Sequence, residues 1–126
     1  MSRRRSMQIH LLKSKIHLAR VTQAALNYEG SITLAADLME RAGILPYERV
    51  LVGNMSNGQR FETYAIRGEP GSGAIILNGA TARLGQPGDK LTIMTYAVVD
   101  AAAATGWKPR VIVLDGSNRV IKEQGI

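Results

Sequence analysis

The chain has 126 residues, with 16 Lys and Arg against 10 Asp and Glu, and it contains no cysteine. This length fits one domain, and the lack of cysteine excludes a disulfide framework, a thiolate nucleophile and a Cys-ligated metal. No apolar run approaches the roughly 20 residues that span a bilayer, and no apolar segment follows the N-terminal arginines as in a signal peptide. We therefore expect a cytoplasmic protein that does not act at a membrane.

The excess of positive charge lies at one end of the chain. Residues 1–20 carry six basic and no acidic side chains, and the remainder is balanced at ten of each. Residues 1–6, with Arg3, Arg4 and Arg5, are expected to form an extension ahead of a domain that begins near Met7. A basic arm that binds nucleic acid is the alternative interpretation.

The first half of the chain predicts two strands and a helix. Residues 9–19 alternate with period two, which favours a strand with Ile16 and Leu18 on one face and Lys15 and His17 on the other. Residues 31–35 form a second apolar run of strand length. Residues 37–43 predict a short helix that Gly43 ends.

The second half is richer in strand and turn signals. Residues 49–66 contain two strand-like runs around Asn57-Gly58, the dipeptide preferred in tight type I′ hairpins. With few aromatic residues, the core should be built from Ile, Leu, Val, Met and Ala. Six or seven short strands favour a small closed barrel over a doubly wound sheet. The remaining predictions are a loop at 68–73, a strand at 74–78, a single helical turn at 80–85, a strand at 91–99, a short helix at 100–106 and a last strand at 109–115.

The common catalytic patterns are missing. His10 and His17 differ in strand parity and have no carboxylate at ligand spacing, so no metal site is expected. The sequence has no phosphate-binding loop, no dinucleotide fingerprint and no nucleophile elbow. Gly-Ser, an ordinary turn pair, occurs three times, and Gly30-Ser31 stands where a polar segment gives way to an apolar one.

Three segments in order give a specific resemblance: KSKIHLARVTQAALNYEGS, NGQRFETYAI and LNGATARLGQPGD. Over about Met7 to Asn118 the chain resembles the pyruvoyl-dependent aspartate 1-decarboxylases. The resemblance implies a mainly β fold, a small double-psi β-barrel with short helices at 7–118, followed by a tail at 119–126. It also implies a homotetramer with active sites between subunits. The implied reaction converts L-aspartate into β-alanine and CO₂ for pantothenate synthesis.

The resemblance further implies that the chain cuts itself between Gly30 and Ser31. The Ser31 hydroxyl would attack the preceding carbonyl, and elimination and hydrolysis would leave a covalent pyruvoyl group, the expected cofactor, with no metal. Gly30 has no Cβ, so we expect it to adopt a strained geometry that gives access to its carbonyl. Thr63 matches a family threonine that would hydrogen-bond to the scissile carbonyl.

Further roles are carried over from the resemblance alone. Arg60 would pair with a substrate carboxylate and Lys15 is a candidate for a second such contact. Tyr64 matches the family's proton donor. The other matching positions are the substrate-contacting residues Thr63, Asn78, Gly79, Ala80 and Thr81, and the supporting residues His17 and Tyr28.

Two features depart from a simple match. Thr63 and Tyr64 are adjacent, so they can serve one site only across a bulge or from different subunits. Gly53 stands where some members carry a large aromatic residue, and Thr81 where Ala is frequent.

Two alternatives stay open: a non-catalytic barrel that binds a partner such as nucleic acid, and a homologue that folds and assembles without maturing.

Overall fold

The computed structural model describes residues 7–125, so the predicted extension at 1–6 lies outside the described residues. Strands dominate it, with α1 (Ala36–Ala42) as its α-helix, and the 3₁₀ turns η1 (Gly79–Arg83) and η2 (Ala101–Ala103). The strands are β1 (Gln8–Arg20), β2 (Gln23–Ala25), β3 (Ser31–Ala35), β4 (Arg49–Asn54), β5 (Arg60–Gly68), β6 (Ile75–Asn78), β7 (Lys90–Asp100), β8 (Arg110–Leu114) and β9 (Val120–Gln124).

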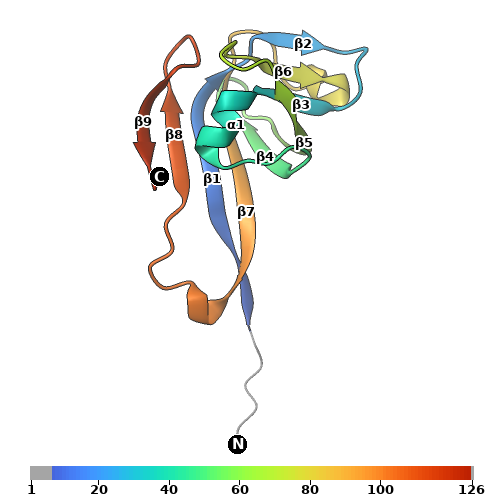
Figure 1. Ribbon diagram of the computed structural model, residues 1–126. Helices are drawn as coiled ribbons and strands as arrows, with labels where there is room; N and C mark the ends of the chain where they lie inside the picture. Colours follow the sequence, from blue (N-terminus) through green and yellow to red (C-terminus); the bar gives the residue numbers. More distant parts are fainter. Residues whose placement is uncertain (1–6, 126) are drawn as a thin grey trace, which may run out of the picture.

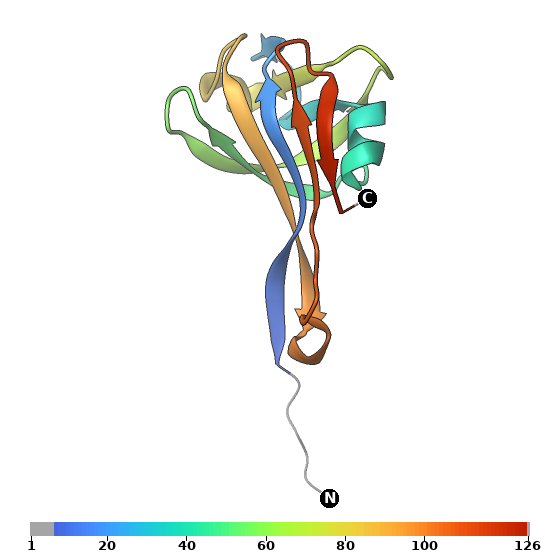
Figure 2. The same cartoon turned by 90° about the vertical axis from the view of Figure 1, so that its left-hand side faces the viewer.

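The strands form one mixed sheet in the order β2-β6-β3-β5-β4-β7-β1-β8-β9. Three of its neighbouring pairs are parallel: β1 with β8, β2 with β6, and β3 with β5. The sheet curls, α1 lies against one side of it, and the paired β1 and β7 extend beyond the body as a ribbon (Figure 1 and Figure 2). The prediction of a mainly β fold is confirmed, and the curled sheet is consistent with a small β-barrel.

The interior of the curled sheet is aliphatic, as the low aromatic content predicts. Its largest fully buried side chains come from β1, β3, β4, β6, β7, β8 and the helix, so one core connects these elements. They are Ile16, Ile32, Leu34, Leu38, Val50, Val52, Ile75, Leu77, Leu91, Ile93, Ile112 and Leu114. The helix ends where the sequence predicts, because Gly43 adopts a left-handed φ of 74° and its N–H bonds back to Glu40.

The long first strand is confirmed, but its alternation breaks near its end. Leu18 has a φ of 64°, and the pairing with β7 shifts between His17 and Ala19. This bulge turns Ala19, rather than Leu18, into the core. The expectation that Leu18 shares the buried face of Ile16 is therefore wrong.

The hairpin between β4 and β5 is also longer than predicted. Its loop spans residues 55–59 and closes with the Asn54 N–H donating to the Gln59 carbonyl over 2.8 Å. A type I′ turn needs a positive φ at both central residues, whereas Gly58 has one (79°) and Asn57 does not. Asn57 instead uses its side-chain amide, which donates to the Leu84 carbonyl over 3.0 Å.

The last predicted strand is followed by another. Residues 120–124, expected in a polar tail, form β9 and pair with β8. The buried side chain of Asn118 stabilises the turn between them, because its amide donates to the carbonyls of Arg20 (2.9 Å) and Gly73 (2.8 Å). In the same turn, backbone N–H groups of Arg119 and Ser117 hold the pKa of Asp115 below its ordinary value.

Candidate active site

Ser31 is the first residue of β3 and is buried, with 1% of its surface exposed. Asn78 lies directly opposite it on β6 and is buried as well. The Asn78 side-chain amide donates to the Ser31 Oγ over 3.0 Å and to the Thr33 Oγ1 over 2.9 Å. The Ser31 hydroxyl is therefore oriented by a neighbour on the next strand, unlike the hydroxyl of an ordinary turn serine.

The turn η1 follows β6 at once and contacts the same residue. The Thr81 hydroxyl lies 3.1 Å from the Ser31 carbonyl oxygen and 2.8 Å from the Asn78 carbonyl oxygen. Residues 78–81 and the start of β3 therefore form one hydrogen-bonded unit, which we call the turn–strand unit. Sequence reasoning placed Asn78 and Thr81 at the site but did not include Thr33, although it follows Ser31 by two positions on the same strand face.

The glycine that this unit needs is Gly79, not Gly30. Gly79 has a φ of 63°, and a Cβ on it would lie 2.7 Å from the Tyr28 carbonyl oxygen and 2.8 Å from the Gly30 Cα. Gly30 has no left-handed φ, and a Cβ on it would meet no atom within 4 Å. The structure thus shows no left-handed conformation at Gly30, and the tight backbone approach is made from the facing turn.

A cavity of about 440 Å³, which we call the cleavage-site pocket, opens beside Ser31. Tyr28 and Tyr64 line it with Ser31, as the resemblance implies for a shared site. The parallel pairing of β3 with β5 begins at Ile32 opposite Ala65, which places Ser31 and Tyr64 on a common face. The lining residues are Tyr28, Glu29, Ser31, Pro46, Tyr47, Tyr64, Ile66 and Arg67.

Tyr47 is a pocket residue that sequence reasoning missed. Its φ of 68° is unusual for a bulky residue, and its N–H donates to the Ala65 carbonyl over 2.7 Å. Its ring centroid lies 6.3 Å from that of Tyr64, an aromatic contact across the pocket. No spacing rule predicts this pair, because the loop after α1 is not regular structure.

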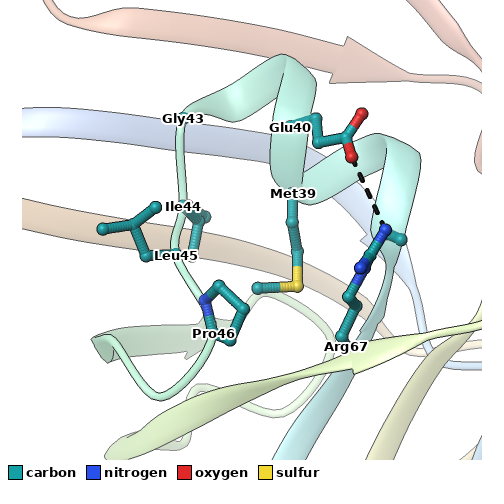
Figure 3. A pocket seen from close by; sticks show the side chains of 8 residues that line it. Met39, Glu40, Gly43, Ile44, Leu45, Pro46 and Arg67 are labelled. Atoms are coloured by element: carbon teal, nitrogen blue, oxygen red, sulfur yellow. Dashed lines mark ion pairs between the residues drawn. The ribbon is translucent and has the colours of Figure 1, made fainter.

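A second, more apolar cavity of about 320 Å³ lies next to the cleavage-site pocket, between α1 and the loop that follows it (Figure 3). Glu40 and Arg67 form an ion pair of 3.7 Å at its edge. It shares Pro46 and Arg67 with the cleavage-site pocket but contains none of the predicted site residues. We therefore assign no catalytic role to it.

Lys15 and Arg60 meet in a different hollow of about 330 Å³, which we call the basic groove. In the sheet register, His17, Thr92, Gly53 and Arg60 form one row across β1, β7, β4 and β5. Lys15 lies two positions before His17 on β1, where it pairs with Met94 of β7. The His17 Nδ1 lies 3.5 Å from the Thr92 Oγ1 in that row. Gly53 has no side chain at the centre of the row, and a Cβ there would meet nothing within 4 Å.

Within one chain the predicted residues thus lie in two separate places: Ser31 and Tyr64 line the cleavage-site pocket, and Lys15 and Arg60 line the basic groove. Arg60 precedes Tyr64 by four positions on β5, a separation of roughly 13 Å along a strand. Thr63 belongs to neither hollow: it pairs with the buried Val50 in an uninterrupted ladder and points away from the face that holds Tyr64. A bulge therefore does not bring Thr63 and Tyr64 together, and the remaining way for both to serve one site is from different subunits.

No group of three or more His, Asp or Glu side chains in residues 7–125 could hold a metal ion. None of the helices described is long and apolar enough to cross a bilayer.

We expect Gly79→Ala to lower the free energy of unfolding by about 2 kcal/mol or more, since it adds a left-handed backbone cost to a collision with residues 28–30. Gly30→Ala, the matched control, should change it by less than about 0.5 kcal/mol. Urea unfolding in a Ser31→Ala background, where the chain stays uncut, would measure both. Equal effects of the two changes would contradict the placement of the tight contact at Gly79.

Comparison with known proteins identifies the family of this chain. A sequence model of the family described as aspartate decarboxylase matches residues 7–121. The chain is 54% identical over 116 residues to the aspartate 1-decarboxylase of Pelotomaculum thermopropionicum, covering 92% of this chain and 88% of the relative. It is 54% identical over 117 residues to that of Syntrophobacter fumaroxidans (93% and 94% covered), and 55% identical over 115 residues to that of Thermoanaerobacter pseudethanolicus (91% and 98% covered). The chain therefore belongs to the aspartate decarboxylase family.

Proposed function

We propose that this protein removes the α-carboxylate of L-aspartate to give β-alanine and CO₂, as a cytoplasmic step toward pantothenate, and that it first cuts its own backbone between Gly30 and Ser31. The family match supports the reaction class. The observation that carries the proposal is the buried Ser31 hydroxyl, oriented by Asn78 and facing the cleavage-site pocket with Tyr64. A merely structural turn serine needs neither the burial nor the adjoining cavity.

Self-cleavage requires the Ser31 hydroxyl to be held in place, because a serine is a weak nucleophile unless its surroundings position it. Its oxygen would add to the Gly30 carbonyl carbon, and the amide bond would be replaced by an ester. Elimination at Ser31 and hydrolysis would then release ammonia and leave residues 1–30 as a separate chain. The buried Ser31, its two hydrogen-bonded neighbours and the adjoining 440 Å³ cavity fit a small keto-acyl group at this position.

A pyruvoyl group formed from Ser31 supplies an electron sink for the electron pair left when CO₂ departs. The side chains then have to bind the substrate and move one proton. Arg60 offers a planar fork of donors to a carboxylate, and Lys15 adds a second positive charge that attracts a substrate with two carboxylates. Tyr64 is 38% exposed at the pocket, so its hydroxyl can reach a bound substrate as proton donor.

The separation of the two hollows supports an active site shared between subunits. Arg60 and Lys15 line the basic groove, whereas Ser31 and Tyr64 line the cleavage-site pocket. A site with all four groups needs the groove of one chain beside the pocket of its neighbour, which is the arrangement expected in a homotetramer. Tyr28 and Tyr47 are 60% and 78% exposed at the pocket rim, and such exposed rings suit a subunit contact.

The two alternatives differ from this proposal in what they require of the chain. A non-catalytic binding module needs no oriented Ser31, and binding to nucleic acid would weaken steeply with salt. A homologue that never matures would share the fold and the assembly but stay a single polypeptide. The match over residues 7–121 favours the enzyme over the binding module.

Ser31→Ala should abolish self-cleavage and decarboxylation together, because the attacking oxygen is removed. Intact-protein mass spectrometry would show one chain for this variant and two fragments for the unaltered protein. Ser72→Ala, at another Gly-Ser pair in a surface loop, is the matched control and should still be cut. Cleavage of the Ser31 variant at the same bond would remove Ser31 from the reaction.

Tyr64→Phe should leave self-cleavage intact and lower kcat by about 10² or more, the usual scale for loss of a general acid. The ring and its contact with Tyr47 are kept, so a fall in kcat reports the hydroxyl. Steady-state kinetics of β-alanine formation, with fragment masses as the maturation control, would measure it. Unchanged kcat would exclude Tyr64 as proton donor.

A mixture of Arg60→Ala and Tyr64→Phe chains should recover activity that neither variant has alone. If each site takes its arginine from one chain and its tyrosine from another, about a quarter of the sites in randomly mixed oligomers contain both native residues. Co-expression with two affinity tags and purification through both would isolate mixed oligomers. Activity no higher than that of the separate variants would show that both residues act within one chain.

A further inference from the structure

We propose that the Thr81 hydroxyl stabilises negative charge on the Ser31 carbonyl oxygen during maturation, and so speeds the elimination that follows ester formation. The inference rests on the self-cleavage proposed above and assigns a role in one of its steps. It concerns the carbonyl of Ser31 itself, not the scissile carbonyl of Gly30 for which Thr63 is the family candidate.

The contact is short and enclosed. The Thr81 Oγ1 lies 3.1 Å from the Ser31 carbonyl oxygen, and Thr81 and Ser31 are 7% and 1% exposed. The Asn78 side-chain amide has two hydrogens, and these point to the hydroxyls of Ser31 and Thr33. Thr81 is therefore the neighbouring side chain whose proton is available to this carbonyl.

The elimination step creates charge on that oxygen. After the ester forms, Ser31 carries a free amine, and its Cα proton passes to water. The electron pair first spreads onto the Ser31 carbonyl oxygen, then forms the Cα–Cβ double bond while the Cβ–Oγ bond breaks. Gly30 leaves as a carboxylate, and the remaining enamine tautomerises and adds water, which releases ammonia and leaves a ketone at the former Cα.

The hydroxyl favours the charged state over the starting state. The Thr81 hydroxyl has one proton. Its oxygen lies closer to the neutral carbonyl oxygen of Asn78 (2.8 Å) than to that of Ser31 (3.1 Å). Because a hydrogen bond to an ionised oxygen is about twice as strong as one to a neutral oxygen, the proton turns toward the Ser31 oxygen as charge develops. A donor that strengthens its bond only in the transition state lowers the barrier, as in an oxyanion hole.

The test compares Thr81→Val, Thr81→Ala and Thr81→Ser with the unaltered protein during incubation after purification. The ester has the mass of the uncut chain, but hydroxylamine cuts it and leaves a C-terminal fragment that begins with Ser31. The completed reaction leaves a C-terminal fragment that is one ammonia lighter than the fragment beginning with Ser31, and its ketone reacts with a hydrazide reagent. Mass spectrometry with and without hydroxylamine therefore counts uncut chain, ester and finished product separately.

We expect Thr81→Val and Thr81→Ala to accumulate hydroxylamine-sensitive ester and to form the ketone about 100-fold more slowly or worse, the usual scale for loss of one oxyanion-hole donor. Thr81→Ser, which keeps the hydroxyl, should mature at close to the unaltered rate. Thr22→Val is the control, since the Thr22 hydroxyl donates to the Ile75 carbonyl (3.1 Å) and accepts from the Ile75 N–H (3.1 Å), away from Ser31. It should lose both hydrogen bonds without accumulating ester.

Several results would overturn the assignment. Normal ketone formation without ester in Thr81→Val and Thr81→Ala would show that the hydroxyl is not needed. Chains that stay uncut and resist hydroxylamine would place Thr81 before ester formation, and ester in Thr22→Val would indicate a general loss of stability. If the unaltered protein itself stays whole, the proposed function fails; if it matures while the Thr81 variants match it, this inference alone fails.

Discussion

The close docking of residues 78–81 onto the start of β3 is the constraint on which the rest of the site depends. Gly79 has room only because it lacks a Cβ, and it brings the turn against the backbone of Gly30. From that position Asn78 reaches the hydroxyl of Ser31 and Thr81 reaches its carbonyl. The backbone at the proposed cleavage site is thus held by a neighbouring strand and turn.

The curved sheet separates two tasks within one chain. The register of β1, β7, β4 and β5 gathers basic side chains in the groove, and β3 with β5 presents Ser31 and Tyr64 on the pocket side. Both hollows depend on β5, which supplies Arg60 near one end and Tyr64 further along. In the proposed shared site each chain would supply one half, so activity would require assembly, and the exposed rings of Tyr28 and Tyr47 would lie at the subunit contact.

Much of the fold followed from local patterns: period-two alternation located β1 and β5, and Gly43 located the end of the helix. The bulge at Leu18, the five-residue hairpin loop and strand β9 did not, because tertiary contacts of Ala19, Asn57 and Asn118 decide them. At the site, motif resemblance named Ser31, Asn78 and Thr81, but it did not separate Arg60 from Tyr64 or identify Tyr47. Those relations arise from strand register and an irregular loop, which no single segment encodes.

The central claim is that the turn–strand unit positions the Ser31 hydroxyl to cleave the bond between Gly30 and Ser31. One measurement tests it most directly. Freshly purified, unaltered protein would be incubated and then analysed by intact mass with and without a hydrazide reagent. The account predicts two fragments that divide after Gly30, with the reagent attached to the C-terminal one. A folded chain that stays whole through prolonged incubation, without reactive carbonyl, would contradict it.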